Sequence, residues 1–180
     1  MKGNSPLIFQ VSGYSNSGKT TLVTKWLSKL HKTGIKAATI KHHGHSKSLT
    51  SADASKDSSE HRKAGAIGSF TVSDKEFQWH MDTSLPISLV DIISFYKRFP
   101  LDILLIEGYK KENYPKILLL RDENDRDLLV NCKQVEAVVC WKYEEYEKLK
   151  KKLSIPVFYI KEEEKYLNWL MYRVEQKEDL

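Results

Sequence analysis

Short apolar runs and amphipathic stretches alternate from the start of the chain. Leu7–Val11 is an apolar run that ends at a serine and a glycine, and it predicts a buried strand. Residues 19 to about 32 place Leu22, Trp26, Leu27 and Leu30 on one face at helical spacing. Thr33-Gly34 predicts the end of this helix, because glycine tolerates the left-handed turn that follows a helix. Ile35–Ile40 is a second predicted strand, so this order indicates a βαβ unit with a parallel pair and a right-handed crossover.

Residues 42–59 break this alternation, because Leu49 is their one apolar side chain larger than alanine. Such a segment buries little surface, and we expect a long, mobile loop. The pattern then predicts a short helix around Asp57–Ala64 and two strands, Ala66–Val72 and Glu76–Met81. These strands are close enough in sequence to pair as a hairpin across residues 73–75.

The second half of the chain continues to alternate strands and helices. Helical spacing over Pro86–Arg98 ends before Pro100, and the apolar run Leu101–Ile106 comes directly after it. The remaining predicted elements are the strands Lys116–Leu120, Val135–Cys140 and Pro156–Ile160 and the amphipathic helices Tyr143–Leu153 and Glu162–Val174. This order predicts one α/β domain over residues 1–180, a three-layer sandwich whose mostly parallel sheet has helices on both faces and a β-hairpin extension.

Composition narrows the class of protein without giving a function. The 180 residues are 41% hydrophobic and 29% charged, as in ordinary globular domains, and no apolar run approaches the roughly 18 residues of a membrane-spanning helix. The first residues do not resemble a signal peptide, and we expect no membrane association. Cys132 and Cys140 are too few for a disulfide scaffold, which favours a reducing cytoplasm. The net charge of +5 permits a polyanionic partner, but most lysines lie among glutamates on predicted helix faces, and we expect no nucleic-acid binding.

The strongest chemical signal is the turn between the first strand and the first helix. Its sequence, Gly13-Tyr14-Ser15-Asn16-Ser17-Gly18-Lys19-Thr20, matches GxxxxGK[ST] at every fixed position. Its glycines allow backbone N–H groups to point at phosphate oxygens, together with the positive end of the helix that follows. Lys19 adds a charge for the β- and γ-phosphates, and the Thr20 hydroxyl is a hard ligand for Mg²⁺. The motif predicts a nucleoside triphosphate with Mg²⁺ in a P-loop NTPase-type fold; the alternative is a glycine-rich turn with an incidental lysine.

The metal side of such a site needs a carboxylate. The apolar run at residues 103–106 has Asp102 before it and Glu107 after it. Parallel sheets bind ligands at the carboxyl ends of their strands, where the phosphate-binding turn also lies, and Asp102 is about 16 Å from that edge. We predict that Glu107 acts on Mg²⁺ through water or on an attacking water. The alternative is an ordinary turn residue beside Gly108.

Three histidines follow the second predicted strand at the same edge. They lie in the segment Lys41-His42-His43-Gly44-His45. Three interpretations stay open: a transition-metal site, contact of His42 and His43 with phosphate or another anion, and a loop exposed to solvent.

Charged residues further along the chain also have two interpretations each. Lys56 or Arg62 can approach a γ-phosphate while Asp57 orients water or metal; alternatively, Asp57 or Ser58 caps the short helix. Arg121 follows the strand Lys116–Leu120, which makes it a third cation at this edge, or else the partner of Asp122 or Glu123 in a surface ion pair.

Together, these residues resemble the molybdopterin-guanine dinucleotide biosynthesis protein B family (MobB). The resemblance rests on stretches in the family's order, which together cover most of the first 122 residues. They are GYSNSGKTTL at Gly13–Leu22, KHHGH at Lys41–His45, SKDSSEHRKAGA at Ser55–Ala66, LDILLIEGYK at Leu101–Lys110 and KILLLRD at Lys116–Asp122. The combination is much more specific than the phosphate-binding turn alone.

The resemblance implies a homodimer that binds GTP and Mg²⁺, hydrolyses GTP weakly, and serves as an adaptor in attaching GMP to molybdopterin. It implies a nucleotidyltransferase and molybdopterin-handling enzymes as partners. On this sequence, residues from Gly13 to Thr21 would bind phosphate, Thr20 and Glu107 would serve the metal, and Lys56, Asp57 and Lys110 would line the site. We expect Lys19, Glu107 and Asp57 to carry the catalytic roles.

The residues alone do not identify the base of the bound nucleotide or the reaction that the protein carries out. No N-K-x-D motif follows a later strand, so a preference for guanine rests on the resemblance. We expect slow hydrolysis, because the candidate second cations lie on loops. A small-molecule or nucleotide kinase is the main alternative, although its usual Arg-rich lid has little counterpart in residues 121–155, which contain two arginines, Arg121 and Arg126. A non-catalytic nucleic-acid-binding module is a third possibility.

Overall fold

The computed structural model describes residues 5–43, 56–81 and 87–176. Its contacts divide the chain into two compact units, one formed by Met1–Gly44 with Tyr96–Leu180 and the other by His45–Phe95. The expectation of a single domain over residues 1–180 stays a prediction.

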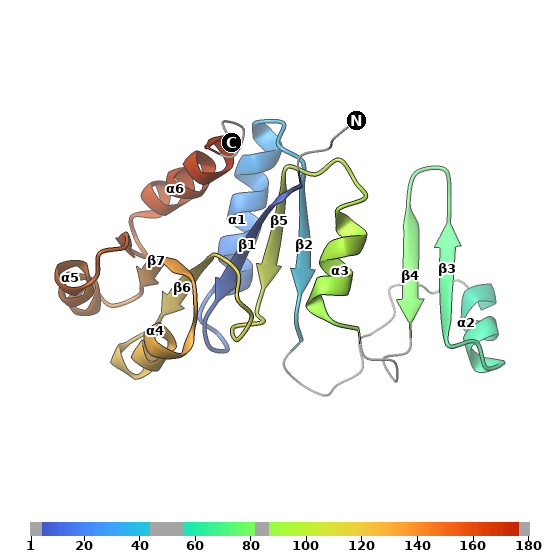
Figure 1. Ribbon diagram of the computed structural model, residues 1–180, viewed down its shortest axis with the longest axis horizontal. Helices are drawn as coiled ribbons and strands as arrows, with labels where there is room; N and C mark the ends of the chain where they lie inside the picture. The colour runs from blue at the N-terminus through green and yellow to red at the C-terminus, as the bar shows by residue number, and fades with distance from the viewer. Residues whose placement is uncertain (1–4, 44–55, 82–86, 177–180) are drawn as a thin grey trace. The chain divides into compact units, whose positions relative to one another are not determined.

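The first unit is built on a parallel sheet whose strand order is β2-β5-β1-β6-β7-β8 (Figure 1). Every neighbouring pair in this sheet is parallel, so the predicted fold class is confirmed. The central strands are nearly continuous apolar runs, as expected for strands covered on both faces. The strands are β1 (Leu7–Ser12), β2 (Ala37–Lys41), β5 (Ile103–Glu107), β6 (Lys116–Leu120), β7 (Val135–Cys140) and β8 (Val157–Tyr159).

Two helices, α1 (Lys19–Lys32) and α6 (Glu163–Glu175), cover one face of this sheet. Their buried side chains form one apolar cluster with alternate residues of the strands, such as Ile117 and Leu119. Trp26 of α1 is fully buried there, and its ring meets that of Phe9 edge to face at a centroid distance of 6.1 Å. This cluster fixes α1, and therefore the turn before it, against the sheet.

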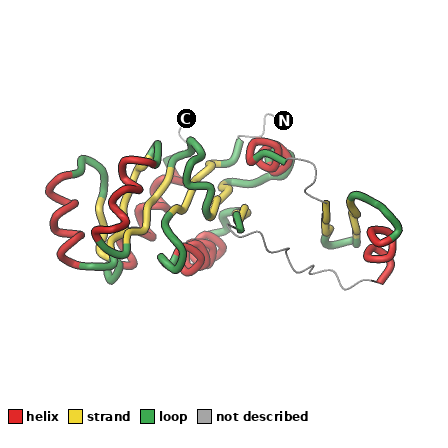
Figure 2. Tube along the Cα trace, turned by 90° about the horizontal axis from the view of Figure 1, so that it is seen from below, coloured by secondary structure: helices red, strands yellow, loops and turns green. Residues whose placement is uncertain are grey.

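The opposite face is covered by α4 (Asp127–Asn131) and α5 (Tyr143–Lys152). The other alternate strand residues, including Leu118 and Leu120, pack there with side chains of both helices. Figure 2 shows the strands of this unit in yellow between helices in red, which is the predicted three-layer arrangement. Sequence patterns did not predict α4 or the 3-10 turn before it, Glu123–Arg126.

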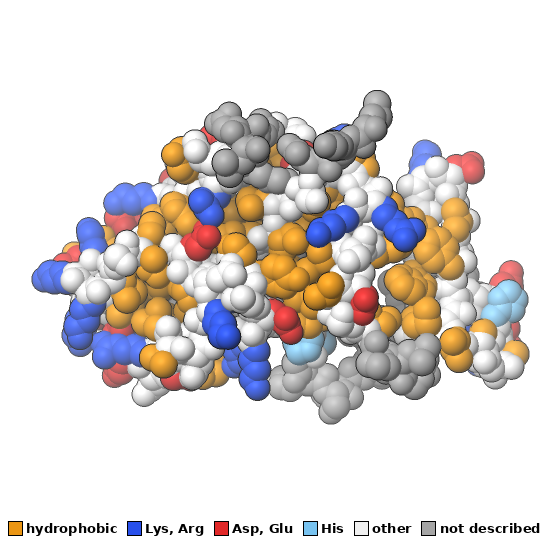
Figure 3. Space-filling view, in the orientation of Figure 1, with side chains coloured by type: hydrophobic (Ala, Val, Ile, Leu, Met, Phe, Trp, Pro, Cys, Tyr) orange, Lys and Arg blue, Asp and Glu red, His pale blue; other side chains and the backbone are white. Residues whose placement is uncertain are grey.

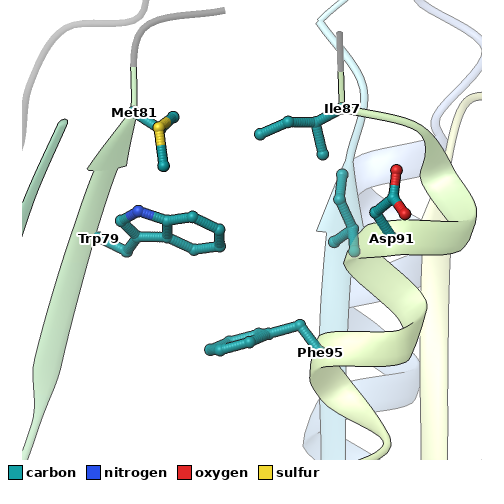
Figure 4. A pocket seen from close by; sticks show the side chains of 6 residues that line it. Trp79, Met81, Ile87, Asp91 and Phe95 are labelled. Carbon is teal, nitrogen blue, oxygen red and sulfur yellow. The ribbon is translucent and has the colours of Figure 1, made fainter. Parts of the chain in front are cut away.

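The second unit contains α2 (Lys56–Lys63) and the antiparallel strands β3 (Gly68–Val72) and β4 (Phe77–Met81). The predicted hairpin is thus confirmed. The helix α3 (Leu89–Tyr96) begins in this unit, and an apolar pocket lies between its side chains and those of β4 (Figure 4). Trp79 and Phe95 line that pocket with ring centroids 5.6 Å apart.

The loop predicted over residues 42–59 is only partly described. Residues 44–55 lie outside the described residues, and α2 begins at Lys56. The loop prediction is therefore wrong for residues 56–59, where the overlapping helix prediction is confirmed. In the part of the chain that the structure describes, no helix is long and apolar enough to cross a membrane.

Candidate functional site

The turn at Gly13–Thr20 follows β1 at the carboxyl edge of the sheet and leads directly into α1. A Cβ on Gly13 would lie 2.9 Å from the carbonyl oxygen of Leu119, so the loop passes too close to β6 for a larger residue. Asn16 and Gly18 have positive φ angles of 60° and 86°. The first turn of α1 carries no acidic residue, which leaves its positive end free to face an anion.

Two polar groups inside this turn are suited to an anion. The Ser17 hydroxyl is buried, and no hydrogen-bond partner is found for it among the described residues. The Lys19 ammonium donates to the carbonyl oxygen of Tyr14 at 2.8 Å, so its side chain folds back over the loop. Burial lowers the pKa of Lys19, as do the nearby charges of Lys110, Lys41 and Arg121, against an opposing effect of Glu107. A bound polyphosphate would relieve this concentration of positive charge.

The metal side of the site joins α1 to the ends of β5 and β2. The Thr20 hydroxyl donates to Glu107 Oε1 at 2.7 Å, and Glu107 is only 8% exposed. Lys41, the last residue of β2, lies 3.1 Å from Thr20 Oγ1 and 3.4 Å from Glu107 Oε1. A hydroxyl and a carboxylate are the hard oxygen ligands that Mg²⁺ takes beside phosphates and water, so these residues fit that ion. Sequence analysis did not single out Lys41 by itself, although its place at the end of a strand before the histidines was a usable signal.

A strained turn follows β5 and holds Glu107 in place. Gly108 and Tyr109 have positive φ angles of 96° and 49°. The Gly108 N–H donates to the Val11 carbonyl at 3.0 Å, and the Gln10 side-chain amide donates to the carbonyls of Gly108 and Tyr109 at 2.7 and 2.5 Å. These bonds fasten the turn to β1, whose end begins the phosphate-binding turn.

The histidines are described only in part. His42 stacks on Tyr109 with ring centroids 4.4 Å apart, and His43 is exposed to solvent. His45 lies outside the described residues. Within residues 5–43, 56–81 and 87–176, no group of three or more His, Cys, Asp or Glu side chains is placed to hold a metal ion. The anion-binding role of His42 and His43 stays a prediction.

Two cations flank the ring of Tyr14, on the β6 side of the turn. The Lys110 ammonium lies 4.2 Å from the ring centroid, and the Arg121 guanidinium carbon lies 5.8 Å from it. Arg121 is held by Asp125, whose buried carboxylate accepts from Nε at 2.9 Å and from Nη2 at 2.8 Å. Its Nη1 donates to the Ser15 carbonyl at 3.3 Å. The ion-pair partner of Arg121 is thus Asp125 and not one of the two predicted acids.

Figure 3 shows Lys or Arg side chains near a histidine at the lower rim, the rim at which β1, β2 and β5 end in Figure 1. The structure therefore gathers Lys19, Thr20 and Glu107 with further cations at one edge of the sheet, as the sequence predicted. Ser15, Asn16 and Thr21 lie on or directly after the turn, but no described side-chain contact assigns them a separate role.

The predicted site residues of α2 belong to the second unit. Lys56 begins α2, and Asp57 lies in its first turn. Arg62 Nη1 donates to the Ser69 hydroxyl of β3 at 2.8 Å. The roles predicted for these three residues toward a γ-phosphate or a metal stay predictions.

Trp141 is a contact of the turn that sequence analysis missed. It follows β7, its indole N–H donates to the Ser17 carbonyl at 3.1 Å, and its ring lies 3.3 Å from the position that a Cβ on Gly18 would take. The sequence does place a tryptophan directly after a predicted strand, at the carboxyl edge of the sheet. That position was the signal from which a contact with the turn could have been predicted.

A parallel sheet with this turn after β1 and helices on both faces defines an α/β fold of the P-loop NTPase type. Residues 8–141 match the family model of "Molybdopterin guanine dinucleotide synthesis protein B". The chain belongs to this family, MobB, as the sequence resemblance indicated.

Curated relatives and solved structures agree with this assignment. The chain is 31% identical over 152 residues to the "Probable molybdopterin-guanine dinucleotide biosynthesis adapter protein" of Bacillus subtilis (strain 168), covering 84% of each chain. It is 34% identical over 128 residues to the adapter protein of Haemophilus influenzae, covering 71% of this chain and 70% of the relative. The crystal structure of Bacillus subtilis MobB superposes with a TM-score of 0.75 at 29% identity, over 92% of this chain and 96% of that one. The MobB homologue of Bacillus stearothermophilus gives a TM-score of 0.71 at 30% identity, over 94% and 98%.

Proposed function

We propose that this chain is an adapter of molybdopterin-guanine dinucleotide biosynthesis that binds GTP with Mg²⁺ at the turn Gly13–Thr20 and hydrolyses it slowly. The observation that supports this most directly is the position of Lys19 in a glycine-rich turn at the N-terminus of α1. Lys41 contacts the neighbouring Thr20, and Lys110 and Arg121 lie over the ring of Tyr14 in the same turn. Such a concentration of positive charge suits a triphosphate better than a singly charged anion.

The metal would complete this arrangement. The Thr20 hydroxyl and the Glu107 carboxylate, 2.7 Å apart, are the residues that would hold Mg²⁺ directly or through water. Bound there, Mg²⁺ would neutralise charge on the phosphates. Lys41 lies within reach of both oxygens and would keep the carboxylate in place when no ion is bound.

Hydrolysis transfers the γ-phosphoryl group to water, with cleavage of the bond between the γ-phosphorus and the oxygen that bridges it to the β-phosphate. This reaction depends on a positioned water and on cations that stabilise charge in the transition state. Glu107 is engaged by Thr20 and Lys41 and is therefore poorly placed to accept a proton from water. This occupation of the carboxylate supports slow turnover unless a partner supplies a further group.

The adapter role is carried over from the curated relatives, whose names describe adapter proteins of this biosynthesis. It implies contacts with a nucleotidyltransferase that handles GMP transfer and with enzymes that carry molybdopterin. We also propose a cytoplasmic homodimer as the working form.

Titration with nucleotides tests the proposal. The wild-type chain and Lys19→Ala are titrated with GTP and ATP, each with and without Mg²⁺, and Glu107→Gln is titrated with GTP over a range of Mg²⁺ concentrations. We expect Mg²⁺-dependent binding of GTP by the wild type, a loss of at least about tenfold in Lys19→Ala, and a higher Mg²⁺ requirement in Glu107→Gln.

Lys151→Ala is a suitable control, because this exposed lysine lies in the last turn of α5 and has no described contact with the phosphate-binding turn. Equal binding by the wild type and Lys19→Ala would contradict the assignment of the phosphate site. Single-turnover hydrolysis faster than about 1 s⁻¹ by the isolated protein would contradict the slow reaction.

A further inference from the structure

Lys41 lies where the sheet brings the ends of two strands next to α1. It is the last residue of β2 and pairs in register with Glu107, the last residue of β5. Glu107 also pairs with Val11 of β1, which belongs to the apolar cluster that α1 forms with the sheet. Register partners point to the same face, so Lys41 and Glu107 both face α1, the helix that carries Thr20. The register of the sheet therefore sets this lysine beside the carboxylate.

The ammonium of Lys41 contacts both oxygens that would hold the metal. Its Nζ lies 3.1 Å from Thr20 Oγ1 and 3.4 Å from Glu107 Oε1, and these two oxygens are 2.7 Å apart. A hydroxyl has one proton and two lone pairs. Here the Thr20 proton is donated to the carboxylate, and a lone pair of Thr20 accepts from Lys41. Both groups that suit Mg²⁺ are thus already engaged with a cation of the chain itself.

The balance of charge decides when this arrangement can take up a metal ion. Glu107 is almost fully buried, and a buried carboxylate without a countercharge is costly, so the ammonium stabilises it. The pair of Lys41 and Glu107 has no net charge, and it therefore offers little attraction to free Mg²⁺. A triphosphate adds several negative charges at the same place. A divalent ion bound to the two oxygens would then repel the ammonium.

A displaced Lys41 has phosphate oxygens within reach. Its charge lies close enough to Lys19 to lower the pKa of that residue, and Lys19 is the lysine that this motif directs to the β- and γ-phosphates. The Lys41 side chain is 48% exposed and starts from the last residue of a strand, so it can change direction without disturbing the core. The two lysines can therefore face the same group of phosphates.

We propose that Lys41 takes the place of the metal ion in the nucleotide-free protein and moves to the γ-phosphate when GTP and Mg²⁺ bind. This inference rests on the nucleotide binding proposed above. The exchange would make the metal site available only together with a nucleotide. It would also give the chain a contact that distinguishes a nucleoside triphosphate from a diphosphate.

A purely structural ion pair between Lys41 and Glu107 predicts different results. Loss of such a pair lowers stability and affects GTP and GDP alike. A lysine that exchanges with the metal instead hinders metal binding before the nucleotide arrives, and afterwards it strengthens the binding of triphosphates alone.

The test compares the wild type with Lys41→Met, Lys41→Arg and the control Lys29→Met. Methionine keeps the unbranched stem without the charge, whereas arginine keeps the charge. Lys29 also pairs with a glutamate, Glu164, at 2.7 Å, but it lies in the last turn of α1, at the other end of the helix from Thr20. The first readout is binding of Mn²⁺, a paramagnetic substitute for Mg²⁺, to the nucleotide-free proteins. We expect Lys41→Met to bind Mn²⁺ at least about tenfold more tightly than the wild type, and the other two variants to match the wild type.

The second readout is the affinity for the Mg²⁺ complexes of GTP and GDP. We expect the ratio of GTP affinity to GDP affinity to fall at least about tenfold in Lys41→Met, because GDP lacks the phosphate that the lysine would contact. Lys41→Arg should keep most of this ratio, since its guanidinium can donate to the same phosphate. Thermal unfolding checks that each variant is folded, and Lys41→Gln is the second uncharged variant if Lys41→Met does not fold.

Two results would overturn the inference while leaving the phosphate site in place. They are equal Mn²⁺ affinity of nucleotide-free Lys41→Met and wild type, and an unchanged ratio of GTP to GDP affinity in that variant. Failure of the wild type to bind GTP would instead contradict the proposed function itself. The Mn²⁺ measurement uses no nucleotide, so it separates the two failures.

Discussion

At the residue scale, Gly13 shows how little freedom the phosphate-binding turn has. A Cβ at this position would lie 2.9 Å from the Leu119 carbonyl oxygen and 2.5 Å from the Ser17 hydroxyl. In Gly13→Ala the loop must move away from β6, and we expect a stability loss of about 1–3 kcal/mol. Nucleotide affinity should fall at least about tenfold, because the backbone N–H groups lose their common direction. Thermal unfolding and nucleotide titration measure the two effects.

Gly34→Ala is the matched control for this substitution. Gly34 also has a positive φ, 78°, but no atom beyond its two chain neighbours is described within 4 Å of the position of an added Cβ. We expect a backbone cost of about 1 kcal/mol and unchanged nucleotide affinity. An equal loss of affinity in both variants would show that general destabilisation, and not the geometry of the turn, causes the effect.

Asp125 offers a second prediction at this scale. Its buried carboxylate orients Arg121, which donates to the Ser15 carbonyl in the phosphate-binding turn. Asp125→Asn removes the charge that fixes the guanidinium, so we expect a severalfold loss of nucleotide affinity besides a loss of stability. Glu145→Gln is the comparison, since Glu145 is an equally buried partner of an arginine, Arg126, that has no described contact with the turn. Titration of both variants should show an affinity change in Asp125→Asn alone.

The sequence predicted some of these residues and not others, for a physical reason. Gly13, Lys19 and Thr20 belong to one continuous motif, and Glu107 follows from the direction of a strand. Lys41 and the tether from Trp141 depend on which strands are neighbours and on side-chain conformation. Neither property is contained in local spacing, so only the folded chain reveals them.

At the scale of elements, long apolar strands and helices with a clear face were predictable. The helix α1 has its predicted bounds, Lys19–Lys32, because four large apolar side chains recur at helical spacing. The 3-10 turn and α4 over residues 123–131 were missed, because such short elements bury too few side chains to produce a period. Asp122 caps the 3-10 turn by accepting from the Asn124 N–H at 3.0 Å, which was the one local signal.

The attachment of α1 to the sheet can be tested at Trp26. This side chain is fully buried against Phe9, and its indole N–H has no hydrogen-bond partner among the described residues. Trp26→Ala leaves a cavity and should cost about 3–5 kcal/mol. Trp26→Phe keeps an aromatic ring and removes the unpaired N–H, so we expect a cost of only about 1–2 kcal/mol. Urea unfolding of both variants measures the difference, and equal costs would contradict this account of the packing.

At the scale of the whole molecule, the site is a property of the sheet and not of any one segment. Residues at or just after the ends of β2, β5, β6 and β7 reach the turn that follows β1, although up to 124 positions separate the bonded residues in sequence. The parallel arrangement is what places all these strand ends at one edge. The same sheet buries Cys140 on its other side, at the end of β7, and we expect this burial to make the free energy of unfolding depend on alkaline pH.

Burial raises the pKa of the Cys140 thiol from 9.0 to about 12. The unfolded chain therefore releases this proton first, so the stabilising contribution is complete below pH 9.0 and is lost as the pH rises toward about 12. We expect the free energy of unfolding of the wild type to fall between pH 9 and pH 11 relative to that of Cys140→Ala, by up to about 1.4 kcal/mol per pH unit. Urea unfolding in the presence of a thiol reductant measures both proteins.

Burial also raises the pKa of Tyr166 and lowers that of Lys116, but both groups are present in each protein, so their effects cancel in the difference. Parallel curves for the two proteins over this range would mean that the thiol ionises without unfolding and that the packing around β7 is looser than described.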